Sequence, residues 1–320
     1  MTDAPRRDPA ALPPGGGLLL VDKPAGCTSH DVVSRVRRVL GLRRVGHAGT
    51  LDPMATGLLV VAVDRATRLL GHLAMTDKTY LATIRLGVRT DSDDADGTVI
   101  ATADPARIDA VDDDALRTAM TTLTGHLMQV PSAVSAIKID GRRAYHRVRA
   151  GERVELAARP VTVGRFDLLD DPRRSPATLD LDVVVDCGTG TYVRSLARDL
   201  GDALGVGGHL TSLRRTRVGP FAVEDAVDVF GGPGQRPPVD ESLIARVTSS
   251  LLPAAAAARR SFPVREVDRA QAADLAHGRL IPAVGLGGTY AAFDGDGGLI
   301  ALVREDGGVA RSVFGWHVPG

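Results

Sequence analysis

The spacing of apolar residues predicts a strand followed by a helix near the start of the chain. A continuous apolar run at residues 17–24 that ends in proline indicates a short buried strand. Thr28 or Ser29 can then cap a helix, and Gly41 is placed to end it. The apolar positions of this helix, which follow the 3.6-residue period, are Val32, Val33, Val36, Val39 and Leu40.

Strand and helix patterns alternate irregularly over the next 180 or so residues. The alternation of apolar and acidic residues at 179–186 is typical of a strand with one wet face. The predicted strands are 58–64, 79–88, 134–139, 179–186 and 209–218, and the predicted helices are 65–75, 111–123 and 191–204. Because no regular strand–helix–strand repeat is present, the order favours an α+β fold with a mixed, largely antiparallel sheet and flanking helices.

The two ends of the chain differ in composition from its middle. The stretch GGPGQRPPVD at 231–240 is typical of a linker. Beyond it, residues 241–320 are expected to form a small β-rich module, with one helix at 268–277 and hairpin turns at 294–298 and 305–308. Residues 1–15 are polar and rich in proline and alanine, so a disordered tail is expected rather than a signal peptide.

Overall composition excludes several classes of protein. The 320 residues are 44% hydrophobic and 24% charged, which is ordinary for a globular chain. Only two cysteines occur, Cys27 and Cys187, which argues against a disulfide framework and against a structural zinc site. No apolar run approaches the roughly 18 residues that a membrane span needs. A cytoplasmic protein without membrane contact is therefore expected.

Charge is balanced overall but clustered by sign along the chain. The sequence has 39 basic and 39 acidic residues. Arginines gather at 35–44, 142–153 and 214–217, whereas acidic residues gather at 91–96 and 109–114. Basic clusters of this kind can hold a polyanion on a neutral protein. Solvated helix faces are the alternative interpretation of each cluster.

The loop GHAGTLDPMATG is the segment most suggestive of chemistry. It holds a single acid, Asp52, and the next acid downstream is Asp64. An aspartate directly before proline is restricted to extended or turn conformations, and the surrounding glycines allow other backbone to approach closely. Such a carboxylate can be a turn former or helix cap. It can also be a nucleophile or a general base.

Six sequence blocks, in this order and at this spacing, resemble the TruB-type tRNA pseudouridine synthase family. They are VDKPAGCTSHDVVSRVRR, RRVGHAGTLDPMATGLLVVAV, DKTYLATIRLGVRTDSDDADG, VPSAVSAIKIDGRRAYHRVRAG, CGTGTYVRSLARDLG and HLTSLRRTRVGPF. The resemblance implies a catalytic domain of the pseudouridine synthase fold at 16–230 and a PUA-like RNA-binding domain at 241–320. It also implies a monomer that converts the uridine at position 55 of the tRNA T-loop to pseudouridine, without metal or cofactor.

The same resemblance implies three catalytic residues. Asp52 matches the catalytic aspartate of the family, which acts either as a nucleophile at C1′ or as the base that removes a ribose proton. Tyr80 matches the tyrosine that stacks on the flipped uracil, where an aromatic face offsets lost stacking. Arg194 matches the arginine that pairs with the catalytic acid and keeps it ionised.

A substrate-binding set follows from the resemblance as well. Its members are His47, Tyr80, Tyr192, Leu213, Lys23, Arg142 and Arg143. The resemblance implies that His47 contacts the RNA and that Tyr192 and Leu213 line the uracil pocket. Lys23 would support the active-site loop or hold a phosphate. An insertion at 131–153 would clamp the T-arm.

Two other functions are compatible with parts of this pattern. An RNA-binding or RNA-folding protein would use the same basic clusters without needing catalysis. A nucleoside hydrolase would use Asp52 but would release free uracil, whereas an isomerase releases no base. The product therefore separates the hydrolase from the isomerase.

Overall fold

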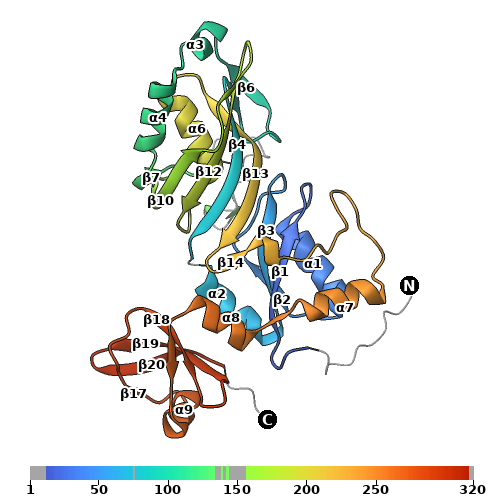
Figure 1. Ribbon diagram of the computed structural model, residues 1–320, viewed down its shortest axis with the longest axis vertical. Coiled ribbons are helices and arrows are strands. Elements are labelled where there is room, and N and C mark those ends of the chain that lie inside the picture. The colour runs from blue at the N-terminus through green and yellow to red at the C-terminus, as the bar shows by residue number, and fades with distance from the viewer. Residues whose placement is uncertain (1–11, 75, 134–137, 140–141, 144–155, 317–320) are drawn as a thin grey trace.

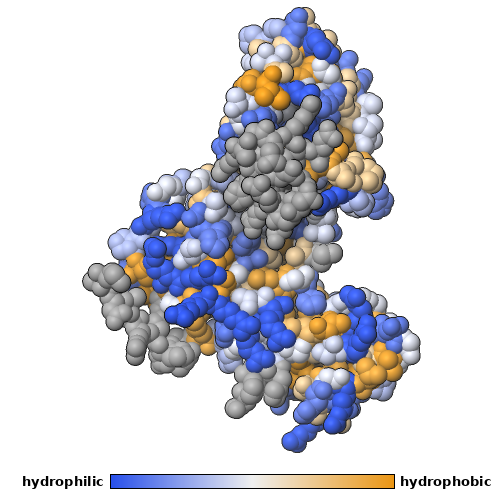
Figure 2. Space-filling model, turned by 180° about the vertical axis from the view of Figure 1, so that it is seen from behind, coloured by the Kyte–Doolittle hydropathy of each residue, from blue (hydrophilic) through white to orange (hydrophobic). Residues whose placement is uncertain are grey.

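The computed structural model describes residues 12–74, 76–133, 138–139, 142–143 and 156–316. It confirms the α+β class, with one large sheet, flanking helices and a smaller C-terminal sheet (Figure 1). A concave outline separates the C-terminal module from the far end of the large sheet in the space-filling view (Figure 2). No helix in the described ranges is long and apolar enough to cross a bilayer.

The large sheet is mixed but mainly antiparallel, as predicted. Its main path runs β15-β1-β3-β13-β4-β12-β10-β7, and the parallel pair in it is β3 with β13. The bounds on this path are β1 (Gly17–Lys23), β3 (Thr56–Val63), β4 (Lys78–Leu86), β7 (Gly125–Gln129), β10 (Arg159–Leu168), β12 (Leu179–Cys187), β13 (Gly208–Val218) and β15 (Leu252–Pro253). Three further strands pair with strands of this path: β2 (Val45–Ala48) with β3, β11 (Arg173–Arg174) with β12, and β14 (Phe221–Ala222) with β13. Two small ribbons are β5 (Val88–Thr90) with β6 (Val99–Thr102), and β8 (Lys138–Ile139) with β9 (Arg142–Arg143).

The first helix forms where the local signals predict it. Thr28 caps α1 in a capping box with Asp31, and Gly41 ends it in the left-handed conformation. The helices are α1 (Ser29–Leu40), α2 (Leu70–Leu73), α3 (Pro105–Asp109), α4 (Asp113–Thr122), α6 (Val193–Ala203), α7 (Glu241–Ser249), α8 (Ala254–Ser261) and α9 (Arg269–Ala276), with 3₁₀ turns η2 (Asp64–Leu69) and η3 (Val223–Asp225). The helix predicted at 65–75 thus begins as the 3₁₀ turn η2 and continues as the short α-helix α2. Figure 1 shows α4 and α6 against one face of the sheet.

The C-terminal sheet contains both predicted hairpins. Its strands are β16 (Val264–Glu266), β17 (Ile281–Pro282), β18 (Thr289–Phe293), β19 (Leu299–Asp306) and β20 (Val309–Gly315), in the order β16-β18-β19-β20-β17. Phe293, Phe314 and Trp316 share an apolar cluster with Leu58 and Phe221 of the larger sheet. The module is therefore joined to the rest of the chain by a common hydrophobic interface.

The chain beyond the predicted linker does not pass directly into this module. Leu243 and Val247, one helical turn apart on α7, are buried in the same core as Val36 of α1. The next strand, β15, pairs with β1 through Leu252 and Leu18. Residues 241–253 consequently pack with the larger sheet rather than with the module that the domain boundary at 241 would assign them to. A linker composition marks where regular structure stops but not where the following helix packs.

The backbone of Arg215 lies so close to Gly57 that a substitution of this glycine tests the pairing of β3 with β13. Gly57 has φ of 98°, and a Cβ there would lie closer than 3.0 Å to the carbonyl oxygen of Arg215. Gly125 has nearly the same φ, 104°, with no described atom within 4 Å of such a Cβ. Gly57→Ala is expected to lower the free energy of unfolding by about 1–3 kcal/mol more than Gly125→Ala, because only the first adds a clash. Urea unfolding of both variants measures the difference, and equal losses would contradict the close approach.

Candidate active site

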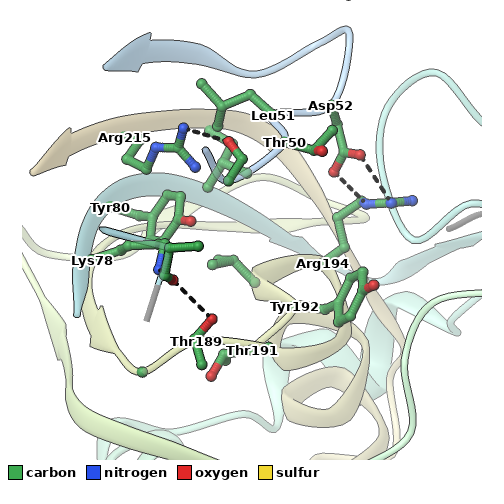
Figure 3. A pocket seen from close by; sticks show the side chains of 16 residues that line it. Thr50, Leu51, Asp52, Lys78, Tyr80, Thr189, Thr191, Tyr192, Arg194 and Arg215 are labelled. Carbon is green, nitrogen blue, oxygen red and sulfur yellow. Dashed lines mark hydrogen bonds and ion pairs between the residues drawn. The ribbon is translucent and has the colours of Figure 1, made fainter. Parts of the chain in front are cut away.

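A cavity of about 300 Å³ opens between the loop before β3, the strands β4 and β13, and the start of α6 (Figure 3). This volume is at the lower end of the range for small-molecule sites, so one nucleoside fits but a duplex does not. Residues that line it include Asp52, Tyr80, Tyr192, Arg194, Leu213 and Arg215. The structure therefore brings together five of the residues predicted from sequence and adds Arg215.

The central feature of the cavity is an ion pair between Asp52 and Arg194. Arg194 Nε lies 3.0 Å from Asp52 Oδ2, and Arg194 Nη2 donates to Asp52 Oδ1 at 3.3 Å. The arginine side chain is 3% exposed, whereas the aspartate side chain is 35% exposed. A buried cation thus holds a carboxylate that remains open to the cavity, as the two facing side chains in Figure 3 show.

Arg194 is itself held by a second carboxylate. Its Nη1 lies 3.3 Å from Asp94 Oδ2 and donates to the backbone oxygen of Ser92 at 2.8 Å. Asp94 is buried and also accepts a hydrogen bond from the Ser92 hydroxyl at 2.5 Å. The guanidinium is therefore fixed between Asp52 and Asp94. The sequence identified Asp94 only as part of an acidic cluster, because nothing local connects it to a residue 100 positions later.

The loop that carries Asp52 is anchored by its backbone. The Ser29 hydroxyl, at the start of α1, accepts from the Leu51 amide at 2.9 Å and donates to the Leu51 oxygen at 3.1 Å. The amide of Gly26 donates to the oxygen of Pro53 at 2.9 Å. These bonds flank Asp52 on both sides, so its carboxylate is presented by a rigid loop rather than by a mobile one.

The side chain of Lys23 holds the backbone of this loop through hydrogen bonds. Its side chain is fully buried, and Nζ donates to the backbone oxygens of Cys27 at 2.7 Å, Pro24 at 3.0 Å and Pro53 at 3.2 Å. Burial lowers the pKa of Lys23, with partial compensation from nearby groups. All three donors of the ammonium group are used, so of the two roles expected for Lys23 the geometry favours loop support over a phosphate contact.

Tyr80 and Leu213 supply apolar walls from adjacent strands. Tyr80 lies on β4 and is 7% exposed, and burial raises the pKa of its hydroxyl, which keeps the ring neutral. Leu213 lies on β13, where it pairs with Ala82 of β4. A neutral aromatic ring and an aliphatic side chain that line the same cavity suit a planar, uncharged base.

Two arginines of the predicted basic clusters are buried rather than exposed. Arg215 is 1% exposed and donates to the oxygens of Leu58 at 2.7 Å and Gly49 at 2.9 Å. Arg35 is 5% exposed and donates to the oxygen of Val229 at 2.9 Å. Each guanidinium satisfies buried carbonyls, which charge counting along the sequence cannot reveal.

Of the remaining predicted substrate contacts, Tyr192 lines the cavity, whereas His47, Arg142 and Arg143 are not in its lining. His47 lies on β2, is not part of the cavity lining, and has its pKa lowered mainly by burial. Tyr192 caps the start of α6 and lines the cavity. Arg142 and Arg143 form β9, paired with β8. Most of the predicted insertion at 131–153 lies outside the described residues.

The described residues offer no arrangement for metal or thiol chemistry. Within them no group of three His, Cys, Asp or Glu side chains is placed to hold a metal ion. Cys27 and Cys187 are both free and buried, and burial raises the pKa of Cys187 to about 11. Among the described residues that line the cavity, Asp52 is the one that carries a carboxylate.

The bond from Arg194 to Asp94 leads to a prediction. Asp94→Asn is expected to slow the reaction at Asp52 about ten- to hundredfold, the effect of removing one charge-assisted bond, because the guanidinium loses one of its two carboxylate partners. Single-turnover kinetics measure it. Asp96→Asn is the matched control, since Asp96 is exposed in the same loop and only its backbone amide contacts Asp94. Equal rates for the two variants would contradict this role of Asp94.

Comparison with known families accounts for most of the chain. Residues 37–193 match the N-terminal domain of the TruB family pseudouridylate synthases. Residues 194–229 match the tRNA pseudouridylate synthase B C-terminal domain, and residues 262–317 match the C-terminal domain of tRNA pseudouridine synthase II. The three matches follow one another without overlap and cover most strands of the large sheet and all five strands of the C-terminal sheet.

Individual relatives are similar over nearly their whole length. The tRNA pseudouridine synthase B of Rhodococcus jostii is 53% identical, over 97% of this chain and 96% of the relative. That of Corynebacterium efficiens is 54% identical, over 93% and 95%. Among solved structures, the archaeal box H/ACA sRNP Nop10-Cbf5 complex contains a chain with a TM-score of 0.65 and 26% identity, covering 93% of this chain and 81% of that one.

Proposed function

Because this chain belongs to the TruB family and is a tRNA pseudouridine synthase, we propose that it isomerises the uridine at position 55 of the tRNA T-loop, with Asp52 at the centre of the reaction. The observation that carries the proposal is the ion pair between Asp52 and Arg194 at the wall of a cavity sized for one nucleoside. Neither similarity of fold nor a basic surface would by itself identify this cavity as the place of the reaction.

Isomerisation sets definite requirements on the site. The N1–C1′ bond breaks, the uracil turns, and a C5–C1′ bond forms; the hydrogen on C5 leaves as a proton while N1 gains one. A uridine inside a structured loop must leave its stack before a side chain can reach C1′. The cavity provides room for the extruded nucleoside, and Tyr80 and Leu213 provide the surfaces that replace its lost stacking.

Asp52 acts on the sugar through an ionised carboxylate. As a nucleophile it attacks C1′ and displaces uracil; as a base it removes a ribose proton so that the N1–C1′ bond can open. Both schemes need the charged form. Arg194 stabilises that form through two contacts, and because it is buried its charge is little screened by water.

The rest of the molecule serves RNA recognition. The T-arm lies across the cavity entrance, with His47 near the loop and the C-terminal module contacting RNA further along the molecule. The protein is expected to act as a monomer. A tRNA substrate implies that the enzyme acts in the cytoplasm, and the clamp at 131–153 with Arg142 and Arg143 strengthens binding in a salt-dependent way.

The target position is tested with three RNAs. A full tRNA transcript, the same transcript with U55 replaced by cytidine, and an isolated T-arm hairpin are incubated with the enzyme, and pseudouridine is mapped by a chemical adduct that stops primer extension. Modification at position 55 of the first and third RNAs, and none in the second, is the expected pattern. Modification of the second RNA, or of another position in the first, would overturn the T-loop assignment.

A further inference from the structure

The end of β7 and the residues after it lie along the first two turns of α6, the helix that carries Arg194. Four consecutive residues, 129–132, make three separate contacts with this helix. They connect the sheet to the insertion predicted at 131–153. We refer to residues 129–132 as the root segment.

The first contact fixes Tyr192. Gln129 is 3% exposed, and its side-chain amide bonds to both backbone groups of Tyr192: Oε1 accepts from the Tyr192 amide at 2.9 Å, and Nε2 donates to the Tyr192 oxygen at 3.2 Å. Tyr192 is the N-cap residue of α6 and has no side-chain capping bond of its own. One side chain of the root segment therefore sets the position at which the helix begins.

The second contact fixes Arg194. Ser132 is fully buried, its hydroxyl accepts from Arg194 Nη1 at 3.3 Å, and it donates to the backbone oxygen of Ser92 at 3.0 Å. Arg194 Nη1 donates to the same oxygen of Ser92. Ser132 thus closes a small ring of hydrogen bonds around the guanidinium on the side away from Asp52.

The third contact lies one turn further along α6. Arg198 Nη2 donates to the backbone oxygen of Val130 at 2.7 Å, and its Nη1 donates to Asp93 at 3.2 Å. The spacing of four residues between Arg194 and Arg198 places both guanidinium groups on one face of the helix. That face meets the root segment and the loop at 90–97 together.

From this geometry we propose that Gln129 and Ser132 are positioning residues for the reaction: they hold Tyr192 and Arg194 in register with Asp52 from the root of the insertion. The inference rests on the proposed role of the Asp52–Arg194 pair. The strength of an N–H bond to a carboxylate depends steeply on its angle. Loss of one hydrogen bond to the guanidinium therefore worsens the orientation of its N–H groups toward Asp52 without removing its charge. Any displacement of the root segment changes the catalytic pair directly.

Ser132→Ala tests this, with Ser195→Ala as its matched control. Ser195 is also fully buried and is next to Arg194 on α6, but its hydroxyl has no hydrogen-bond partner among the described residues. For Ser132→Ala, the single-turnover rate constant on tRNA transcript is expected to fall about three- to tenfold with an unchanged Kd for tRNA, because Arg194 Nη1 loses the hydroxyl but keeps its contacts with Ser92 and Asp94. For Ser195→Ala, both quantities should stay within about twofold of wild type, because the substitution breaks no hydrogen bond among the described residues.

A double-mutant cycle separates positioning from general packing. If Ser132 acts through the guanidinium, Ser132→Ala should cost little further activity in an Arg194→Lys background. Gln129→Met, which keeps the side-chain length but loses both bonds to Tyr192, should also lower the rate constant without changing Kd. Wild-type rates for Ser132→Ala, a loss of tRNA affinity alone, or an equal loss in Ser195→Ala would overturn the inference. Inactivity of the wild-type enzyme would instead refute the proposed function.

Discussion

Asp52→Asn is expected to abolish isomerisation while leaving tRNA binding nearly normal. The substitution is almost isosteric but removes the charge that both schemes at C1′ require, so the single-turnover rate should fall by about 10⁴-fold or more. The cavity walls and the RNA-binding surface do not depend on that charge. Nucleoside analysis of the product and filter-binding measurements of Kd for the tRNA report the two effects separately.

Asp64→Asn provides the control for this substitution. Asp64 is the next acid along the chain and lies at the start of η2 with φ of 52°, a conformation that asparagine also tolerates. Its variant should retain wild-type activity. Substantial turnover by Asp52→Asn, or an equal loss in both variants, would mean that the carboxylate of Asp52 is not the reacting group.

Arg194→Ala is expected to damage the reaction nearly as much as loss of Asp52. Without the guanidinium, the Asp52 carboxylate loses its paired charge and its orientation, and the buried Asp94 loses its ion-pair partner. Arg194→Lys should recover only part of the activity, because an ammonium group cannot bond to both oxygens of Asp52 and to Asp94 in one plane. Single-turnover rates at saturating enzyme measure both variants.

The control for Arg194 is an arginine in a comparable pair at the surface. Arg85 bonds to both carboxylate oxygens of Asp180 at 2.7 Å, but it is 40% exposed and is not among the residues that line the cavity. Arg85→Ala should leave the rate unchanged, since exposed pairs contribute little. Thermal unfolding of all three variants shows how much of any loss is due to destabilisation. Near-normal turnover by folded Arg194→Ala would refute the pairing.

Local signals in the sequence were sufficient for elements such as α1. Its cap at Thr28, its apolar period and its terminal Gly41 all act within the helix itself. The strand β10 was not predicted, because Gly164 and its exposed polar positions carry little local preference for a strand. Its place is fixed instead by pairing with β7 and β12, which come from distant parts of the chain.

The residues of the site likewise divide into those that a local sequence motif marks and those that only long-range packing brings to the site. Asp52, Tyr80 and Arg194 were predicted because each stands in a distinctive motif, and the structure brings all three to one cavity. Asp94 and Ser132 were not, because an acid within an acidic run and a serine beside proline have no local mark of function. Their contacts with Arg194 arise only when α6 packs beside the loop at 90–97 and the end of β7.

Release of tritium from the C5 position of uridine tests the central claim most directly. A tRNA transcript labelled with tritium at C5 of residue 55 is mixed with excess enzyme in a single turnover, and tritiated water and free uracil are both quantified. Formation of the C5–C1′ bond must expel that hydrogen, so wild type is expected to release one tritium per tRNA with no free uracil, and Asp52→Asn to release none. Free uracil as the product, or no release despite intact tRNA binding, would contradict the account.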